Sequence, residues 1–223
     1  MASRKLERER QILDTAAVLF RERGYQGMRM DDLAAAMNLN KGTLYHYFPS
    51  KAALLYRIYL DTSVEFIEGI RVHPADAPAD ELLALVIGDI AAAMEQRRDY
   101  VTVYFQEMHW VDKWLEPDHF EEINALQVEF RNYITGIIER GVKDGTFRPL
   151  DASVAAFAVI GMVGWSYQWF MPGGRYTMDD LAGIFTDLAL TAFSGPAATD
   201  ASSGAAPTRA RGRAGQGSRP GSK

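Results

Sequence analysis

The chain has 223 residues, of which 48% are hydrophobic and 24% are charged, and it contains no cysteine. This length can bury the core of one large domain or two small ones, and the absence of cysteine excludes disulfides, thiolate metal sites and cysteine redox chemistry. No uncharged apolar run reaches the length of a membrane span, and no apolar stretch follows the charged N-terminal segment. We therefore expect a cytoplasmic protein without a secretory signal.

The net charge of −5 hides a separation of charge along the chain. Residues 1–60 contain ten Lys/Arg against six Asp/Glu, residues 61–195 contain nine against twenty-two, and residues 196–223 contain five against one. A basic N-terminal segment on an acidic remainder favours approach of that end to a phosphate backbone. Without a nucleic-acid-binding motif, solubility would be the simpler explanation of the asymmetry.

Apolar residues recur at helical spacing along most of the chain and no alternating β pattern occurs, so the sequence predicts an all-α fold of about nine helices. The predicted helices cover about residues 6–23, two short segments within 29–48, then 51–72, 80–94, 99–115, 118–144, 152–170 and 178–193. We expect Gly24 and Gly145 to end the first and seventh helices. Predicted N-terminal caps, where a short polar side chain precedes an apolar helical segment, are Asn40, Ser50, Asp118, Asp151 and Thr177.

Residues 29–51 have the pattern of two short helices around a tight turn. Leu33 lies on the apolar stripe of the first short helix, and Asn38 tolerates the left-handed backbone that can end it. Leu44 and Phe48 lie four residues apart in the second helix and can face the core. This arrangement predicts a helix-turn-helix, whose second helix enters the DNA major groove.

The motif resembles the TetR family of bacterial one-component repressors. The resemblance is carried by Gly24-Tyr25, by Asp32-Leu33-Ala34 and above all by the run KGTLYHYFPSK at residues 41–51. It covers residues 6–60, whereas the remainder matches only in length and helical rhythm. Arg29 stands where the family usually has a threonine cap, so we expect Asp31 to take over capping of the second helix.

The resemblance implies which residues contact DNA. The start of the third helix would lie at base edges, its aromatic run would contact phosphates, and the lysine at the start of the fourth helix would bind a phosphate. Taken singly, His46 is as easily a surface residue, and Tyr45 or Tyr47 a partly buried one. The predicted DNA-binding residues are Arg29, Lys41, Gly42, Thr43, Tyr45, His46, Tyr47 and Lys51.

Three parts are predicted along the chain. Residues 1–50 form the DNA-binding helix-turn-helix domain, residues 51–195 a ligand-binding and dimerisation domain, and residues 196–223 a disordered Ala/Gly/Ser/Arg-rich tail. By resemblance and by apolar pattern, the last two helices form a homodimer, with Gly161 and Gly164 allowing close helix approach. The tail arginines can add weak DNA attraction, although a merely solvated end is the simpler interpretation.

Aromatic and methionine side chains of the second domain indicate a pocket for a small hydrophobic effector. The segments YFQE at residues 104–107 and WSYQWFMPGG at residues 165–174 are similar to a TetR subgroup that governs fatty-acid or steroid breakdown. That similarity implies an acyl-CoA effector, whose phosphates could meet Arg97, Arg98 or Arg131; equally, the second segment can be a helix stop at the dimer edge. The predicted ligand-binding residues are Tyr104, Glu107, Met108, Trp165 and Trp169.

The prediction is therefore a ligand-responsive repressor that binds a palindromic operator in double-stranded DNA as a homodimer. An enzyme is disfavoured because the chain lacks a phosphate loop and a nucleophile elbow, and we expect no cofactor, no membrane association and no metal. Glu107, His109 and Asp112 are close in sequence but do not share one helix face. Two alternatives remain: a drug-responsive repressor of an efflux pump, and a ligand-binding homologue that lost DNA binding. Arg29, in place of the usual threonine, is the feature that favours the second alternative.

Overall fold

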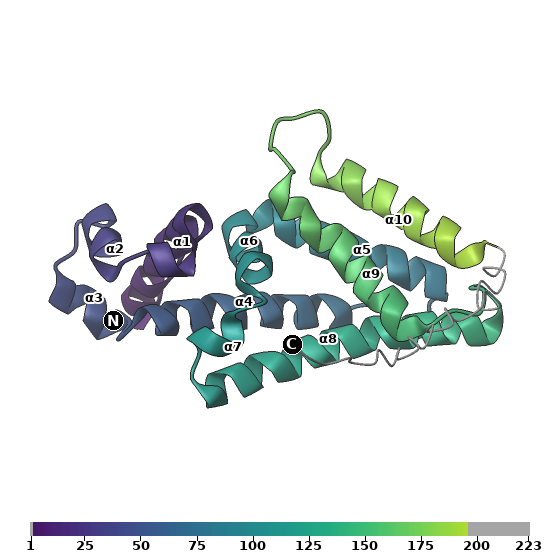
Figure 1. Cartoon of the computed structure of the whole chain (residues 1–223), viewed down its shortest axis with the longest axis horizontal. Helices are drawn as coiled ribbons and strands as arrows, with labels where there is room; N and C mark the ends of the chain where they lie inside the picture. The colour runs from purple at the N-terminus through teal and green to yellow at the C-terminus, as the bar shows by residue number, and fades with distance from the viewer. Residues whose placement is uncertain (1, 196–223) are drawn as a thin grey trace, which may run out of the picture.

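The computed structural model describes residues 2–195 of the chain. These residues form ten α-helices, one short 3₁₀ helix and no strand, so the all-α prediction is confirmed (Figure 1). The predicted disordered tail at residues 196–223 lies outside the described residues. None of the helices in the described part is long and apolar enough to cross a membrane. The α-helices are α1 (Ala2–Gly27), α2 (Met30–Ala36), α3 (Lys41–Tyr47), α4 (Lys51–Arg71), α5 (Ala79–Gln96), α6 (Arg98–Glu107), α7 (Val111–Trp114), α8 (Pro117–Asp144), α9 (Ala152–Gly164) and α10 (Met178–Ser194).

Helices α1 to α3 form a small unit, here called the head, at one end of the molecule (Figure 1). Its core contains Phe20, Leu33 and Leu44, all fully buried. The backbone of α1 departs from helical geometry at Gly24, with φ 68° and ψ 167°, so the helix bends where the sequence predicts its end. Asn38 has φ 52° and closes α2 in the left-handed conformation, as predicted.

Most predicted caps are present. The side chains of Asn40, Ser50 and Asp151 accept hydrogen bonds from backbone N–H groups of α3, α4 and α9, and Thr177 forms a complete capping box with Asp180 at α10.

Two predicted caps are wrong. Arg29 occupies the N-cap of α2 without a side-chain cap, and the Asp31 carboxylate instead pairs with Lys41, 2.8 Å away. Helix α8 begins at Pro117, one residue before Asp118. Proline suits this first position because it has no N–H to satisfy and its φ is already helical.

Two helices predicted as continuous are interrupted. The predicted helix at residues 99–115 divides into α6 and α7, with Trp110 at φ −124° and ψ −6° between them. The predicted helix at residues 152–170 stops after Gly164 and continues as a 3₁₀ turn, η1 (Trp165–Gln168). Val111 and Ser166 are again buried after the two breaks, so the period of buried positions continues across them. This periodicity therefore did not reveal the change in direction.

The remaining helices form the body, and α4 runs from the head along it (Figure 1). Helix α5 packs against α10, α8, α9, α6 and α4, and α8 also covers α4. Gly164 faces α6 rather than a second copy of the chain, because a Cβ built there would lie 2.5 Å from the Phe105 ring. Gly161, one turn earlier, is exposed with nothing within 4 Å.

We expect Gly164→Ala to lower the free energy of unfolding by about 1–3 kcal/mol, because the added methyl must displace the buried Phe105 ring. Gly136→Ala is the matched control, since Gly136 is exposed on α8 with no neighbour within 4 Å; it should be neutral or stabilising by up to about 1 kcal/mol. Denaturant unfolding measures both. Equal effects of the two substitutions would contradict the close α6–α9 contact.

Candidate functional site

Helix α3 displays the side chains expected of a recognition helix. Lys41, Gly42, Tyr45 and His46 are exposed, whereas Leu44 and Phe48 are buried against the head core. The Asn40 side chain accepts from the N–H of Thr43 at 2.8 Å, so α3 starts at a defined point. Helix α3 therefore presents a basic, hydroxyl-rich and aromatic face on a rigid support.

Two predicted DNA contacts have partners within the head. Lys41 pairs with Asp31, which raises the pKa of the lysine through a hydrogen bond and charge attraction. The lysine is fully charged at neutral pH and remains exposed. Tyr47 is half-buried, with its ring edge-on to His46 at 5.7 Å between centroids. Arg29 is exposed beside α2.

Lys51 is placed differently from the phosphate-binding role that the resemblance implies. Its ammonium donates to the backbone carbonyls of Tyr25 at 2.7 Å and Met28 at 3.2 Å, and it lies 4.3 Å from the centre of the Tyr25 ring. Burial lowers the pKa of the amine, while Glu107 opposes this shift. The ammonium thus binds the carbonyls exposed by the bend of α1 and fixes that bend to the start of α4.

The second partner of this bend is Glu107, at the end of α6. Its carboxylate accepts the backbone N–H of Tyr25 at 2.8 Å, and the residue is only 8% exposed. The Tyr25 ring stacks on Trp114 of α7 at 5.0 Å and on Phe20 of α1 at 5.7 Å. We call Tyr25, Lys51, Glu107 and Trp114 the joint, because they connect the head to the body.

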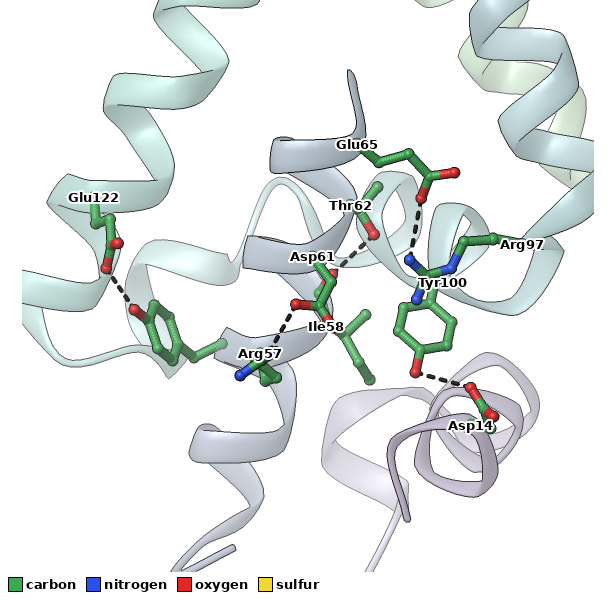
Figure 2. A network of polar contacts seen from close by, with 10 residues as sticks. Asp14, Arg57, Ile58, Asp61, Thr62, Glu65, Arg97, Tyr100 and Glu122 are labelled. Atoms are coloured by element: carbon green, nitrogen blue, oxygen red, sulfur yellow. Dashed lines mark hydrogen bonds and ion pairs between the residues drawn. The ribbon is translucent and has the colours of Figure 1, made fainter. Parts of the chain in front are cut away.

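Further polar contacts join α1 to α6. The Tyr100 hydroxyl donates to Asp14 at 3.0 Å, and Arg21 pairs with Asp99 at 2.7 Å. Figure 2 shows Asp14 and Tyr100 meeting beside an Arg97–Glu65 ion pair that connects α6 to α4. Burial raises the pKa of Tyr100, and the neighbouring Asp14 adds to the rise. The phenol therefore stays protonated and remains a donor at neutral pH.

Helix α4 is tied to α6 and α8 along its length. The Tyr59 hydroxyl, fully buried, donates to the backbone carbonyl of Tyr104 at 2.7 Å. On its other side, Tyr56 donates to Glu122 of α8 (Figure 2), and this hydrogen bond raises the pKa of Tyr56 to about 12. Helix α4 thus cannot shift without breaking contacts to both neighbours.

A cavity of about 120 Å³ lies in the body between α4, α5, α6, α8 and α9. Its wall is apolar and aromatic apart from an amide, a guanidinium and the phenol hydroxyl of Tyr104, and Arg131 is the one charged residue among the described residues that line it. The Arg131 guanidinium lies 5.2 Å from the centre of the half-exposed Phe157 ring. The lining residues are Phe66, Ile90, Tyr104, Phe105, Met108, Gln127, Phe130, Arg131, Phe157 and Ile160.

The structure brings some predicted ligand residues to this cavity and not others. Tyr104 and Met108 line it. Glu107 points to the joint instead, and Trp165 and Trp169 are 60% and 49% exposed on η1 and just after it, because the helix break after Gly164 turns them outward. Trp165 and Trp169 therefore do not line this cavity, and their contact with a ligand stays a prediction.

Of the three arginines predicted to meet the phosphates of an acyl-CoA, two lie away from this cavity. Arg97 pairs with Glu65, and Arg98 donates to the backbone carbonyl of Phe170 at 3.3 Å, so only Arg131 of the three lies at the cavity. Gln127 was missed by the sequence reasoning. It occupies the inward stripe of α8 together with Phe130 and Ile134, and a polar residue at such a position was the available signal.

A larger groove of about 820 Å³ lies between α1, α3, α4 and α6. It is a poor candidate for a ligand site because its polar groups already have partners: Asp14 binds Tyr100, Arg57 pairs with Asp61, and Arg97 pairs with Glu65. Among residues 2–195, no group of three His, Asp or Glu side chains is placed to hold a metal ion. The body cavity is thus the better ligand site.

Two family profiles match the chain. The profile described as "Bacterial regulatory proteins, tetR family" matches residues 12–58, which cover most of the head and the start of α4. The profile described as "Tetracyclin repressor-like, C-terminal domain" matches residues 76–193, more than half of the chain. The chain belongs to the TetR family. The family predicted from residues 24–51 is therefore confirmed.

Named relatives agree with this assignment. The HTH-type transcriptional repressor KstR2 of Rhodococcus jostii is 30% identical over 198 residues, which cover 87% of this chain and 95% of the relative. The TetR-family regulator PfmR of Thermus thermophilus is 33% identical, with a TM-score of 0.72 over 80% of this chain and 96% of its own. AibR, solved with isovaleryl coenzyme A and operator DNA, is 28% identical, with a TM-score of 0.71; the match covers 85% of this chain and 99% of AibR. This TetR-family protein is a ligand-responsive, DNA-binding transcriptional repressor.

We expect Glu107→Ala to lower the free energy of unfolding by about 1–3 kcal/mol, because the N–H of Tyr25 loses its partner. The amide of Tyr25 should also exchange its hydrogen with solvent faster, as hydrogen-exchange mass spectrometry can measure. Glu107→Gln is the control, since its amide oxygen can still accept. An unchanged hydrogen-exchange rate of the Tyr25 amide in Glu107→Ala would contradict the hydrogen bond between Glu107 and Tyr25 in the joint.

A second prediction separates the roles of Lys41 and Lys51. Lys41→Met should reduce the slope of log DNA affinity against log salt by about one, because an exposed cation at the proposed DNA interface is lost. Lys51→Met should leave this slope unchanged but destabilise the fold by about 1–3 kcal/mol, because backbone carbonyls lose their donor. DNA titrations at several salt concentrations measure the two slopes. A slope reduced by Lys51→Met would show that Lys51 contacts a phosphate, as the family resemblance implies.

Proposed function

We propose that the protein represses transcription as a homodimer on a palindromic operator and is released by an anionic acyl thioester, of which an acyl-CoA is the simplest case. Residues 1–50 would bind DNA, and residues 51–195 would bind the ligand and dimerise. The observation that carries the proposal is the cavity beside α6. Arg131 is the one charged residue that lines this cavity, and α6 ends at Glu107 of the joint.

The DNA-binding part of the proposal rests on α3. Its exposed face combines a cation, hydroxyl groups and aromatic rings, and its first residues include a glycine that allows close backbone approach to bases. We propose that base edges are contacted from Lys41, Gly42 and Thr43. The proposed phosphate contacts come from Arg29, Tyr45, His46 and Tyr47, whereas Lys51 is assigned to the joint.

Dimerisation is supported by an apolar outer face on α9 and α10. Val154 and Phe157 of α9 and Trp165 at the start of η1 are 56–64% exposed, with the small residues Ala158 and Gly161 between them in the sequence. Ile184 and Leu188 are exposed on α10, which lies beside α9 (Figure 1). Pairing this face with its copy would form a four-helix interface and place two heads on two half-sites.

The nature of the effector follows from the charge at the cavity. A guanidinium without a carboxylate in the lining favours an anionic ligand and disfavours the cationic drugs of an efflux regulator. The CoA part of a thioester is anionic, and its acyl part is apolar, which suits the aromatic wall. AibR, whose fold and sequence are similar, was solved with isovaleryl coenzyme A.

The route from effector to DNA would run through α6. Tyr104 lines the cavity, and Glu107, one helical turn later, holds Tyr25 of the head. A ligand that displaces α6 therefore changes the position of the head relative to α4. This mechanism is binding only, without catalysis, and it operates on DNA in the cytoplasm.

We expect isovaleryl-CoA to weaken DNA binding about 5- to 150-fold, the range of typical allosteric coupling. An operator selected from a random DNA pool, followed by fluorescence anisotropy, measures the effect; free CoA and tetraphenylphosphonium are the comparison ligands. Arg131→Gln should abolish release while keeping the DNA affinity of the free protein. Release by the cation alone would favour the efflux regulator, and failure to select any DNA would favour a homologue that lost DNA binding.

A further inference from the structure

The inner wall of the body cavity contains the polar side chains of Gln127 and Tyr104, and the buried Ser63 lies near Tyr104 behind this wall. The amide nitrogen of Gln127 is buried without a hydrogen-bond partner, and Gln127 lines the cavity from α8. The hydroxyl of Ser63 on α4, in a residue that is 2% exposed, also has no partner. Buried donors without acceptors are rare in folded proteins, because each has lost its hydrogen bonds to water.

These two groups flank a third, the hydroxyl of Tyr104 on α6. Burial raises the pKa of Tyr104, and the nearby side chains of Gln127 and Ser63 oppose this rise. Tyr104 is 7% exposed and lines the same cavity as Gln127. Helices α6 and α8 therefore place a hydroxyl and an amide in a wall that is otherwise apolar apart from Arg131, and α4 places the Ser63 hydroxyl near them.

Each member of this group can donate a hydrogen bond at neutral pH, and the hydroxyl and amide oxygens can also accept one. The neighbouring lining residues are Phe66, Phe105, Phe130 and Ile160, which neither donate nor accept. An apolar ligand would leave the amide nitrogen of Gln127, a donor only, without a partner. A ligand oxygen placed beside this nitrogen would satisfy it and would be held away from water.

Building on the proposed function, we propose that the acyl part of the effector is short and presents a carbonyl oxygen to Gln127 and Tyr104, with Ser63 behind Tyr104. The cavity of about 120 Å³ is small beside the roughly 300–1,000 Å³ of common ligand pockets, which suits a short acyl group rather than a long chain. The carbonyl is that of the thioester itself or of an oxo group further along the acyl chain.

This arrangement makes the site select for oxygen as well as for size. A pocket built to hydrogen-bond a ligand group rejects an analogue lacking that group more strongly than an apolar pocket rejects a small change in chain length. Gln127 and Tyr104 are then the specificity-determining residues, and Arg131 attracts the anionic part. The separation of these two roles allows each to be tested alone.

The experiment compares three four-carbon ligands on the full-length protein by isothermal titration calorimetry. Butyryl-CoA has the thioester carbonyl, S-butyl-CoA is the thioether without it, and acetoacetyl-CoA has the thioester and an additional oxo group. We expect about tenfold tighter binding of butyryl-CoA than of S-butyl-CoA if the thioester carbonyl is bound. We expect about tenfold tighter binding of acetoacetyl-CoA than of butyryl-CoA if the oxo group is bound.

Gln127→Leu should remove whichever preference the unaltered protein shows, while its affinity for S-butyl-CoA stays unchanged. Tyr104→Phe, which removes one hydroxyl, is the second variant should Gln127→Leu fail to fold. Thr102→Val is the matched control, since it removes another buried, unpartnered hydroxyl of α6 that does not line the cavity; it should keep the preference.

Equal binding of all three ligands that still release DNA would overturn the carbonyl site and leave the proposed function standing. A preference that survives in both Gln127→Leu and Tyr104→Phe would overturn it as well. If none of the three ligands binds, and isovaleryl-CoA does not release DNA, the proposed function falls together with this inference.

Discussion

The arrangement of head and body depends on how the backbone around Tyr25 is held. Its N–H donates to Glu107 of α6, and its carbonyl accepts from Lys51 of α4. Two helices of the body therefore bind the backbone of one residue of the head. The bend at Gly24 makes this possible, because it exposes backbone groups that a straight helix would satisfy itself. The ring of Tyr25 then packs on Trp114, which keeps water from these hydrogen bonds.

The joint also explains how a small ligand in the body can act on DNA. Helix α6 contributes Tyr104 to the cavity, Glu107 to the joint, and Tyr100 to a further contact with α1. A packed helix moves as a unit rather than bending freely, so a displacement at one turn reaches the next. Only a few hydrogen bonds need to differ between the DNA-bound state and the ligand-bound state, because typical allosteric coupling amounts to about 1–3 kcal/mol.

In the proposed ligand site, recognition would be divided between the polar groups of the cavity. Arg131 provides charge, while the amide and hydroxyl groups around Tyr104 provide directed donors in an apolar setting. Charge attracts a ligand over distance, whereas a buried donor discriminates by position. None of this was visible as a motif, since Ser63 and Gln127 lie on different helices and each reads in the sequence as a single polar interruption of an apolar stripe.

The sequence by itself determined the helical class, most caps, the helix-turn-helix and the family, because these depend on contacts between residues a few positions apart. Only the tertiary structure decided the roles of Lys51 and Glu107, the outward turn of Trp165 and Trp169, and the break between α6 and α7. The reason is physical: a charged or aromatic side chain binds whatever a distant helix places beside it, and local spacing carries no information about that partner.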